Sequence, residues 1–193
     1  MRILHIDIET SPCLAHVWGI WQQNVGLNQL MGVTEVLCFV AKWHGEDELI
    51  FAGQNTMTKK QMILKAWLLL DEADVICHYN GRRFDVPHLN REFIGQGLTP
   101  PSPYKQIDLL QTVKKQFRFP SNKLDYVSQA LGLGKKVKHI GHDLWVGCMN
   151  GDKKCWEMME DYNRQDVVLL ESLYNKLMPW VVGHPQRGLY TTS

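Results

Sequence analysis

Hydrophobic residues alternate with polar ones near the start of the chain and become almost continuous farther along. Residues 2–8 show the two-residue alternation, with β-branched positions, that is typical of a strand. Residues 35–43 are nearly all apolar, as expected for a strand in a sheet that is covered on both faces. Residues 48–52 predict a third strand, and Gly45 marks a hairpin turn before it. Residues 18–32, rich in Gln, Asn and Gly, predict a loop between the first two strands.

A helical period replaces this pattern in the middle of the chain. Thr58 is a suitable N-cap for a helix that continues to Leu70. The remaining predicted elements are a buried strand at 74–79, a loop at Asn80-Gly81, a helix at 83–94, an extended connection at 99–103, a short strand or helix at 107–110, a helix at 123–131 closed by Gly132, and a helix at 154–177 that stops at Pro179.

This order of elements predicts an α/β fold. Three antiparallel strands, followed by alternating helices and strands, indicate one mixed β-sheet flanked by helices. No repeat, low-complexity tract or Gly/Ser linker divides the chain. We therefore expect a single domain over residues 1–180 and a polar tail over residues 181–193.

Composition narrows the class of protein. The chain has 193 residues, of which 45% are hydrophobic and 21% charged, and this balance excludes disorder as a description of the whole chain. The apolar runs are too short for a transmembrane helix, and Asp7 and Glu9 interrupt what would be a secretory signal, so we expect a soluble cytoplasmic protein. Five cysteines without a C-x-x-C pair predict reduced, mostly buried thiols. One group of potential zinc ligands fits no common spacing: His139, His142, Cys148 and Cys155.

Asp7 and Glu9 are two residues apart on the first predicted strand. With a period of two, both carboxylates project from one face while Ile6 and Ile8 point to the other. Like charges side by side destabilise a sheet unless a cation lies between them. Taken alone, such a pair is more simply interpreted as a solvated strand end.

Acidic residues at two later places can also be interpreted either as ordinary structural residues or as part of a site. Asp85 follows a buried strand and falls in the first turn of the next helix. It is either a carboxylate that the helix dipole favours, or part of a site at the carboxyl end of a sheet strand. Tyr162 and Asp166 are four residues apart and share one face of the last helix, where they are either an exposed acid beside a tyrosine or part of a site. Each segment alone is weak, but the three in this order strongly indicate one site.

These segments resemble the three motifs of the DEDD superfamily of exonucleases. The motifs read D-x-E-T at residues 7–10, N-x-x-x-F-D at residues 80–85 and Y-x-x-x-D at residues 162–166. The histidine form of the third motif would need a His at the position of Asp161, so the chain resembles the tyrosine (DEDDy) branch of 3′–5′ exonucleases. Proofreading domains of family A and B DNA polymerases belong to that branch. The resemblance extends over nearly the whole chain without a polymerase domain, and it implies a ribonuclease H-like fold and a stand-alone exonuclease. Two further segments, residues 123–127 and 130–135, resemble the helix and glycine-containing stretch that precede the third motif.

The resemblance implies a two-metal mechanism for phosphodiester hydrolysis. Hard oxygen ligands suit two divalent cations, Mg²⁺ or Mn²⁺. Asp7 would bridge both cations, Glu9 and Asp166 would hold the ion that generates hydroxide, and Asp85 would bind the second ion, partly through water. Tyr162 would orient the attacking water, because a phenol with a pKa near 10 is a poor base at neutral pH.

Substrate contacts are expected beside these carboxylates. The resemblance implies that Thr10 contacts the terminal nucleotide, chiefly through its backbone. Asn80 and Phe84 would help to place the scissile end, or would equally support the loop. Four residues outside the motifs are expected to serve in packing: His78, His88, Trp18 and Trp21. For the two tryptophans, stacking on unpaired bases is the alternative.

The expected function is metal-dependent 3′–5′ exonuclease activity on single-stranded DNA, which releases nucleoside monophosphates in DNA replication and repair. The expected partners are nucleic acid and replication or recombination proteins. The alternatives are an exoribonuclease, a non-catalytic binding module for nucleic acid or protein, and a structure-selective nuclease or resolvase. Four carboxylates favour an enzyme over a binding module, and the Tyr162/Asp166 pair favours the exonuclease branch.

The charge distribution agrees with a nucleic-acid substrate better than the net charge does. Lys and Arg number 21 and Asp and Glu 20, for a formal charge of +1. Residues 105–139 nevertheless hold eight basic residues against Asp108 and Asp125, so this segment carries +6 and the rest of the chain −5. A segment that could follow a phosphate backbone is offset by a cluster of acids suited to cations. A solvated lysine-rich face is the alternative interpretation.

Overall fold

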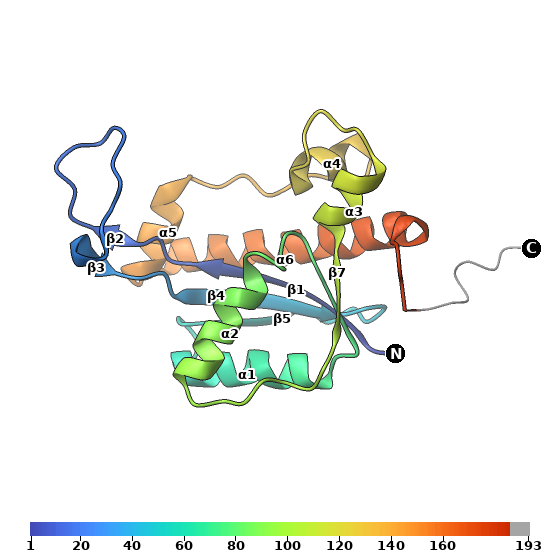
Figure 1. Ribbon diagram of the computed structural model, residues 1–193, viewed down its shortest axis with the longest axis horizontal. Helices are drawn as coiled ribbons and strands as arrows, with labels where there is room; N and C mark the ends of the chain where they lie inside the picture. Colours follow the sequence, from blue (N-terminus) through green and yellow to red (C-terminus); the bar gives the residue numbers. More distant parts are fainter. Residues whose placement is uncertain (186–193) are drawn as a thin grey trace, which may run out of the picture.

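A five-stranded mixed sheet lies at the centre of the computed structural model, which describes residues 1–185 (Figure 1). Its strands follow the spatial order β5-β4-β1-β6-β7. β1 pairs antiparallel with β4, β4 pairs antiparallel with β5, and β1, β6 and β7 run parallel. The bounds are β1 Ile3–Thr10, β4 Val36–Trp43, β5 Ile50–Gly53, β6 Val75–His78 and β7 Lys105–Asp108. The predicted mixed α/β sheet is confirmed.

Helices cover both faces of the sheet, as Figure 1 shows. On one face, α1 (Lys59–Glu72) and α2 (Asp85–Gly95) pack against the even-numbered residues of β1, including Leu4, Ile6 and Ile8. On the other face, α6 (Lys153–Leu177) lies along β1 and β4 and buries one side of its length. The remaining helices are α3 Leu109–Gln116, α4 Leu124–Ala130, α5 His142–Met149 and a 3₁₀ turn at Met178–Trp180.

Local signals explain where these helices begin. Thr58 caps α1 as predicted, because its side chain accepts a hydrogen bond from the Gln61 backbone N–H. Asp108 ends β7 and caps α3 by accepting from the Leu110 N–H, so the region predicted as a short strand or helix holds the end of one and the start of the other. Helix α5 was not predicted from the sequence. It packs on α6 through Leu144 and Cys148.

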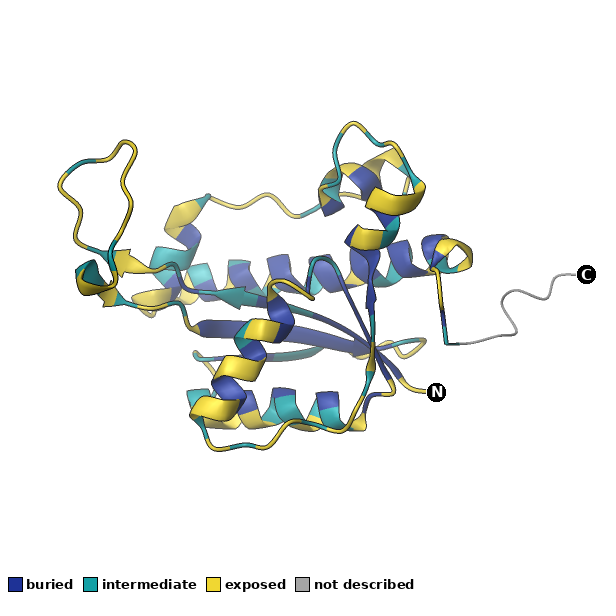
Figure 2. Ribbon diagram, in the orientation of Figure 1, coloured by how far each residue is buried: buried dark blue, intermediate teal, exposed yellow. Residues whose placement is uncertain are grey.

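The region between β1 and β4 extends away from the sheet and is mostly exposed (Figure 2). Two short strands, β2 (Leu14–Ala15) and β3 (Leu30–Gly32), form an antiparallel pair at its base. A 3₁₀ turn, Leu27–Gln29, precedes β3. The prediction of a loop or irregular segment at 18–32 is therefore correct apart from these short elements.

The predicted tail begins with residues that pack on the domain. Val181 and His184 are buried, and the hydroxyl of Tyr174 on α6 lies 2.7 Å from His184 Nε2. The rest of that tail, residues 186–193, lies outside the described residues, and the boundary at residue 180 stays a prediction. No helix among residues 1–185 combines the length and the apolar character that crossing a membrane requires.

Candidate active site

The alternation of β1 places its acidic residues on the face toward α6. Ile6 and Ile8 point into the core beneath α1 and α2, so Asp7 and Glu9 lie on the opposite face. Asp7 Oδ2 accepts a hydrogen bond of 2.6 Å from Asn163 Nδ2 of α6. Glu9 Oε2 accepts one of 3.2 Å from Trp145 Nε1 of α5. Both carboxylates therefore face the two helices that cover this side of the sheet.

Four carboxylates from three elements meet at this place, which we call the carboxylate group: Asp7, Glu9, Asp85 and Asp166. One oxygen each from Asp7, Glu9 and Asp166 lie within 4.8 Å of one another. Asp85, the first residue of α2, joins them from the other side of β1, because its Oδ1 accepts a 3.0 Å hydrogen bond from the Ile8 N–H. Asp85 and Asp166 are only 3% and 2% exposed. The structure thus brings together the acids of all three sequence motifs.

Burial makes negative charge on these acids costly. It raises the pKa of Asp7 well above its ordinary value, and the charges of Asp85 and Glu9 raise it further. Burial and the charge of Asp166 raise the pKa of Glu9 to about 8. Burial also raises the pKa of Asp85 to about 7, although hydrogen bonds from backbone N–H groups oppose that shift. An added positive charge would stabilise the ionised form of each of these carboxylates.

The donor set fits hard divalent cations. All of its potential ligand atoms are carboxylate oxygens, which Mg²⁺ and Mn²⁺ prefer. The buried Oδ1 of Asp166 has no hydrogen-bond partner among residues 1–185. Such an orphaned oxygen is expected in a protein whose cation completes the site. The carboxylate group is therefore a candidate metal centre.

Lys136 partly neutralises the carboxylate group. Its Nζ lies 2.5 Å from Asp166 Oδ2 and donates to the Tyr162 hydroxyl over 3.1 Å. Burial opposes the ammonium charge, but the charge of Asp166 and the hydroxyl of Tyr162 outweigh it and raise the pKa of Lys136. Burial and Asp166 likewise raise the pKa of Tyr162, so its phenol stays protonated at neutral pH. Tyr162 can therefore donate a hydrogen bond here, but it is not a base.

Aromatic rings enclose one side of the carboxylate group. The rings of His139 and Tyr162 are 4.9 Å apart between centroids, and those of His139 and Trp145 are 5.1 Å apart, all edge to face. Trp145 thus both packs in this wall and donates to Glu9. Sequence reasoning did not identify Trp145, Asn163 or Lys136 as site residues. Asn163 is adjacent to Tyr162 in the third motif, and this proximity was the available signal for it.

The three predicted substrate-contact residues, Thr10, Asn80 and Phe84, lie next to the carboxylate group in sequence or in space. Asn80 has a positive φ of 70° and its N–H donates to Asp108 Oδ1 over 2.9 Å, which fixes the loop after β6. Asn80 and Asp7 line a cavity of about 400 Å³. Phe84 is 37% exposed, and its ring centroid lies 4.6 Å from that of His88. Thr10 is partly buried at the end of β1, where the pairing register with β4 shifts.

Lysines line the space next to Tyr162. A cavity of about 580 Å³ opens there between α4 and α6. Its lining includes Lys135, Lys136, Lys138, His139 and Tyr162. Part of the basic segment recognised in the sequence therefore lies against the carboxylate group. A larger cavity of about 720 Å³ lies beside α5 and the start of α6, and no member of the carboxylate group lines it.

The comparison with protein families agrees with this arrangement. A family model described as the RNase_H superfamily matches residues 24–178, which is most of the chain. The chain belongs to the RNase H superfamily. The matched range contains Asp85, Tyr162 and Asp166, whereas Asp7 and Glu9 precede it. No curated protein matches this superfamily member.

A solved structure shares the fold over a larger part of the chain. A family B DNA polymerase from the hyperthermophilic archaeon Pyrobaculum calidifontis matches this RNase H superfamily chain with a TM-score of 0.70 and 19% sequence identity. The match covers 92% of the chain but 24% of the polymerase, so the chain spans about a quarter of that protein's length. At this identity the match establishes the fold, and the predicted ribonuclease H-like fold is confirmed.

A second cluster of polar side chains lies on the same face of β1, nearer the start of the strand. His5, His44 and Glu171 offer nitrogen and oxygen atoms within 4.8 Å of one another. Both Glu171 oxygens already have protein partners, because Lys42 Nζ lies 2.5 Å from one of them and the Gly45 N–H donates to the other. Burial lowers the pKa of His5 to about 3, so its ring is neutral. This group ties β1 and the end of β4 to α6.

The structure also places the residues that the motifs left unassigned. His78 is fully buried, and its ring lies 3.1 Å from Gln106 and accepts from the Gly81 N–H, so the expectation of packing is confirmed. His88 packs on Phe84. The prediction of packing is wrong for Trp18 and Trp21. They are 99% and 79% exposed, because the segment that carries them extends away from the sheet. The cysteine–histidine set considered for zinc is not among the candidate metal-binding groups within residues 1–185.

Proposed function

We propose that this protein is a metal-dependent 3′–5′ exonuclease of the DEDDy type that releases nucleoside monophosphates from single-stranded DNA. The observation that carries the proposal is the carboxylate group itself, in which oxygens of Asp7, Glu9 and Asp166 lie within 4.8 Å and Asp85 adjoins them. Tyr162 stands next to Asp166, where the tyrosine branch of these nucleases has its third motif. The superfamily and the fold support a nuclease.

The carboxylates would hold two divalent cations, Mg²⁺ or Mn²⁺. In this proposal Asp7 would be a ligand of both, Glu9 and Asp166 would hold one, and Asp85 would hold the other. When bound, such cations stabilise the charge that develops on the attacking and leaving oxygens and acidify water. Asn163 fixes the orientation of Asp7 through its 2.6 Å hydrogen bond, and Trp145 does the same for Glu9. Both carboxylates are thus held in position before a substrate arrives.

Tyr162 positions the attacking water through its hydroxyl, which remains protonated because burial raises its pKa. Lys136 lies between this hydroxyl and Asp166, so its ammonium can also meet a phosphate oxygen that enters from the lysine-lined cavity. Thr10, Asn80 and Phe84 adjoin the carboxylates and are proposed to hold the terminal nucleotides. The partly exposed ring of Phe84 offers a surface for an unpaired base.

A 5′-labelled single strand tests the proposal directly. Purified protein with Mg²⁺ or Mn²⁺ is expected to shorten the strand stepwise from its 3′ end, and a chelator is expected to stop the reaction. Asp7→Ala and Asp166→Ala should abolish turnover while the fold persists. Asp161→Ala is the matched control, because Asp161 is an exposed acid of the same helix and should leave the rate unchanged. An intact strand, or internal cleavage, contradicts the proposal.

Parallel digestion identifies the polymer. DNA and RNA of one sequence, each single-stranded and duplex, are digested under the same conditions. We expect single-stranded DNA to be digested at least as fast as RNA, because the proposal includes no residue dedicated to a 2′-hydroxyl. Faster digestion of RNA would replace the substrate in the proposal and would keep the chemistry.

A further inference from the structure

The segment between β1 and β4 carries an unusual concentration of exposed apolar side chains. We call residues 11–34 the tryptophan arm. Figure 1 shows it as a long excursion from one end of the sheet, and Figure 2 shows that most of its outer part is exposed. At its outer part, Trp18 is 99% exposed, Ile20 82%, Trp21 79% and Leu27 88%. Large aromatic side chains gain most when they are covered, so this concentration indicates a binding surface.

The tryptophan arm contains no Asp, Glu, Lys or Arg, although such residues make up 21% of the chain. Its polar residues are uncharged apart from His16, whose charge depends on pH. A polyanion can therefore approach the arm without repulsion. The arm also lacks the Lys and Arg residues with which helices and loops bind anionic lipid surfaces.

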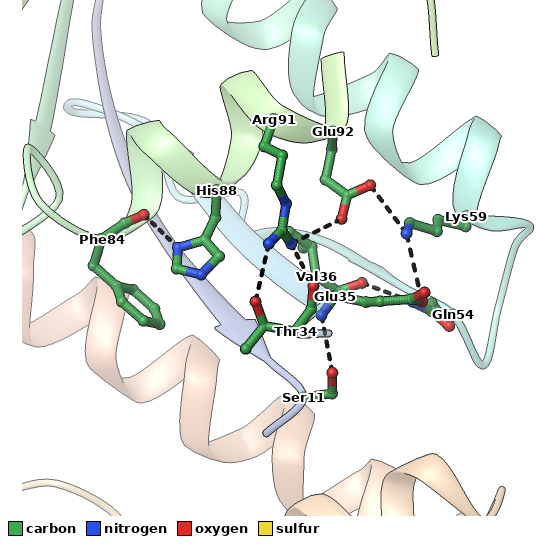
Figure 3. A network of polar contacts seen from close by, with 10 residues as sticks. All are labelled: Ser11, Thr34, Glu35, Val36, Gln54, Lys59, Phe84, His88, Arg91 and Glu92. Atoms are coloured by element: carbon green, nitrogen blue, oxygen red, sulfur yellow. Dashed lines mark hydrogen bonds and ion pairs between the residues drawn. The ribbon is translucent and has the colours of Figure 1, made fainter. Parts of the chain in front are cut away.

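Hydrogen bonds fix the base of the tryptophan arm (Figure 3). The two ends of the arm are joined, because the Ser11 N–H donates to the Glu35 carbonyl over 2.8 Å and the Glu35 N–H donates to Ser11 Oγ over 2.9 Å. Arg91 of α2 donates to the carbonyl and the hydroxyl of Thr34. Lys59 of α1 lies 3.4 Å from a Glu35 carboxylate oxygen. The base is thus attached to both helices on that face of the sheet.

The anchoring elements are the ones that carry the carboxylates. The tryptophan arm begins directly after Thr10, at the end of the strand that holds Asp7 and Glu9. Helix α2, which supplies Arg91, begins at Asp85. Phe84 immediately precedes this helix and packs on its His88, as Figure 3 shows, so the Phe84 ring adjoins the element that binds the base of the arm. The base of the arm therefore has a fixed relation to the place where the 3′ end would react.

We propose that Trp18 and Trp21 form a stacking platform for unpaired bases of the strand whose 3′ end is being hydrolysed. This inference rests on the proposed function and adds an upstream binding site to it. Base stacking on exposed aromatic rings tolerates any sequence, as an exonuclease requires, and needs no charged residue. The phosphates would instead follow the lysines near Tyr162.

The reach of the arm sets the length of strand that can use the platform. Trp18 lies eight residues beyond Thr10, so an extended chain separates them by at most about 28 Å. A strand with at least the 3.4 Å rise per nucleotide of a duplex strand crosses that distance within about eight nucleotides. An oligomer of a dozen nucleotides is therefore long enough to reach both the platform and the carboxylates.

The test measures binding without hydrolysis. The full chain carrying Asp7→Asn is titrated with fluorescein-labelled oligo(dT) of twelve nucleotides, and fluorescence anisotropy gives the Kd. Adding Trp18→Ala or Trp21→Ala is expected to weaken binding by about fivefold or more for each tryptophan. Trp180→Ala is the matched control, because Trp180 is 53% exposed and packs on Phe117, outside the tryptophan arm. Its Kd should not change.

A pair of substitutions separates stacking from a general apolar contact. Trp18→Phe should retain most of the affinity, whereas Trp18→Leu should lose as much as Trp18→Ala. Two results would overturn the inference: equal affinity of the Trp18→Leu and Trp18→Phe variants, or an unchanged Kd in the Trp18→Ala/Trp21→Ala double variant. Either result would favour a protein as the partner of the arm.

Hydrolysis of a nitrophenyl ester of thymidine monophosphate separates the two proposals, because this substrate has no upstream base. If the unmutated protein cleaves the ester while the double variant binds oligo(dT) as tightly as its parent, only the stacking inference fails. If the unmutated protein neither cleaves the ester nor binds oligo(dT), both proposals fail.

Discussion

Replacing Glu9 by Gln should make the metal-free protein more stable at neutral pH. Burial and the charge of Asp166 raise the pKa of Glu9 from an ordinary 4.5 to about 8. The folded state therefore binds more protons than the unfolded state between these two values, and the free energy of unfolding falls as the pH rises through this window. Gln has the same shape, carries no charge and can still accept the hydrogen bond from Trp145.

The size of the effect follows from the same shift. With a pKa near 8 in the folded protein and 4.5 in the unfolded chain, ionising Glu9 costs about 3 kcal/mol at pH 7 and less than about 1 kcal/mol at pH 5. Because Glu9 is partly buried rather than fully enclosed, we expect Glu9→Gln to add about 1–3 kcal/mol at pH 7. For a chain of this length, the gain corresponds to a rise in Tm of roughly 2–10 °C.

Thermal unfolding in a chelator at pH 5 and pH 7 measures the difference. Glu157→Gln is the matched control, because Glu157 is an exposed glutamate of α6 and should change the stability by less than about 0.5 kcal/mol. Adding Mn²⁺ should reverse the order at pH 7, since the cation stabilises the unmutated carboxylate group by mass action. A gain that is as large at pH 5 as at pH 7, or a loss of stability at pH 7, would refute the reasoning.

Three further outcomes follow from contacts in and near the site. Tyr162→Phe should slow hydrolysis about 10- to 1000-fold while Mn²⁺ binding measured by calorimetry is kept, and full activity would remove the hydroxyl from the mechanism. Lys136→Met should tighten Mn²⁺ binding about tenfold, because the ammonium no longer competes for Asp166; weaker binding would show that the lysine supports the cation instead. Gly81→Ala should destabilise the fold by about 1–3 kcal/mol in denaturant unfolding, because the added Cβ would lie 2.4 Å from the buried ring of His78. Gly95→Ala is the control and should not destabilise the fold, because there is open space around Gly95. Equal stability of the two variants would contradict this reasoning.

Most of the framework could be predicted because its signals are local. The strand Val36–Trp43 is almost continuously apolar, and α1 has both an apolar stripe and a capping threonine. The acids were identified from short motifs, each contained within one element and its flanking turn. The structure adds that the three motifs lie at one place, which no single segment could show.

The parts that escaped prediction depend on partners far away in the sequence. Helix α5 has only two fully buried residues and a glycine in its interior, so its pattern is too short to indicate a helix. Lys136 is one of several lysines in its segment, and only the fold brings it to Asp166, thirty residues later. Trp145 belongs to the unpredicted helix, so its contact with Glu9 could not be inferred either.

The order of the elements along the chain has a consequence for synthesis on the ribosome. Asp7 and Glu9 are made before Asp166, which follows 159 positions after Asp7, on the last long helix. At about 5–20 residues per second, roughly 8–30 s pass between them. During that interval a growing chain lacks a complete carboxylate group. Under the proposed function, the newborn polypeptide is therefore inert toward nearby nucleic acid, and fragments released before α6 remain harmless.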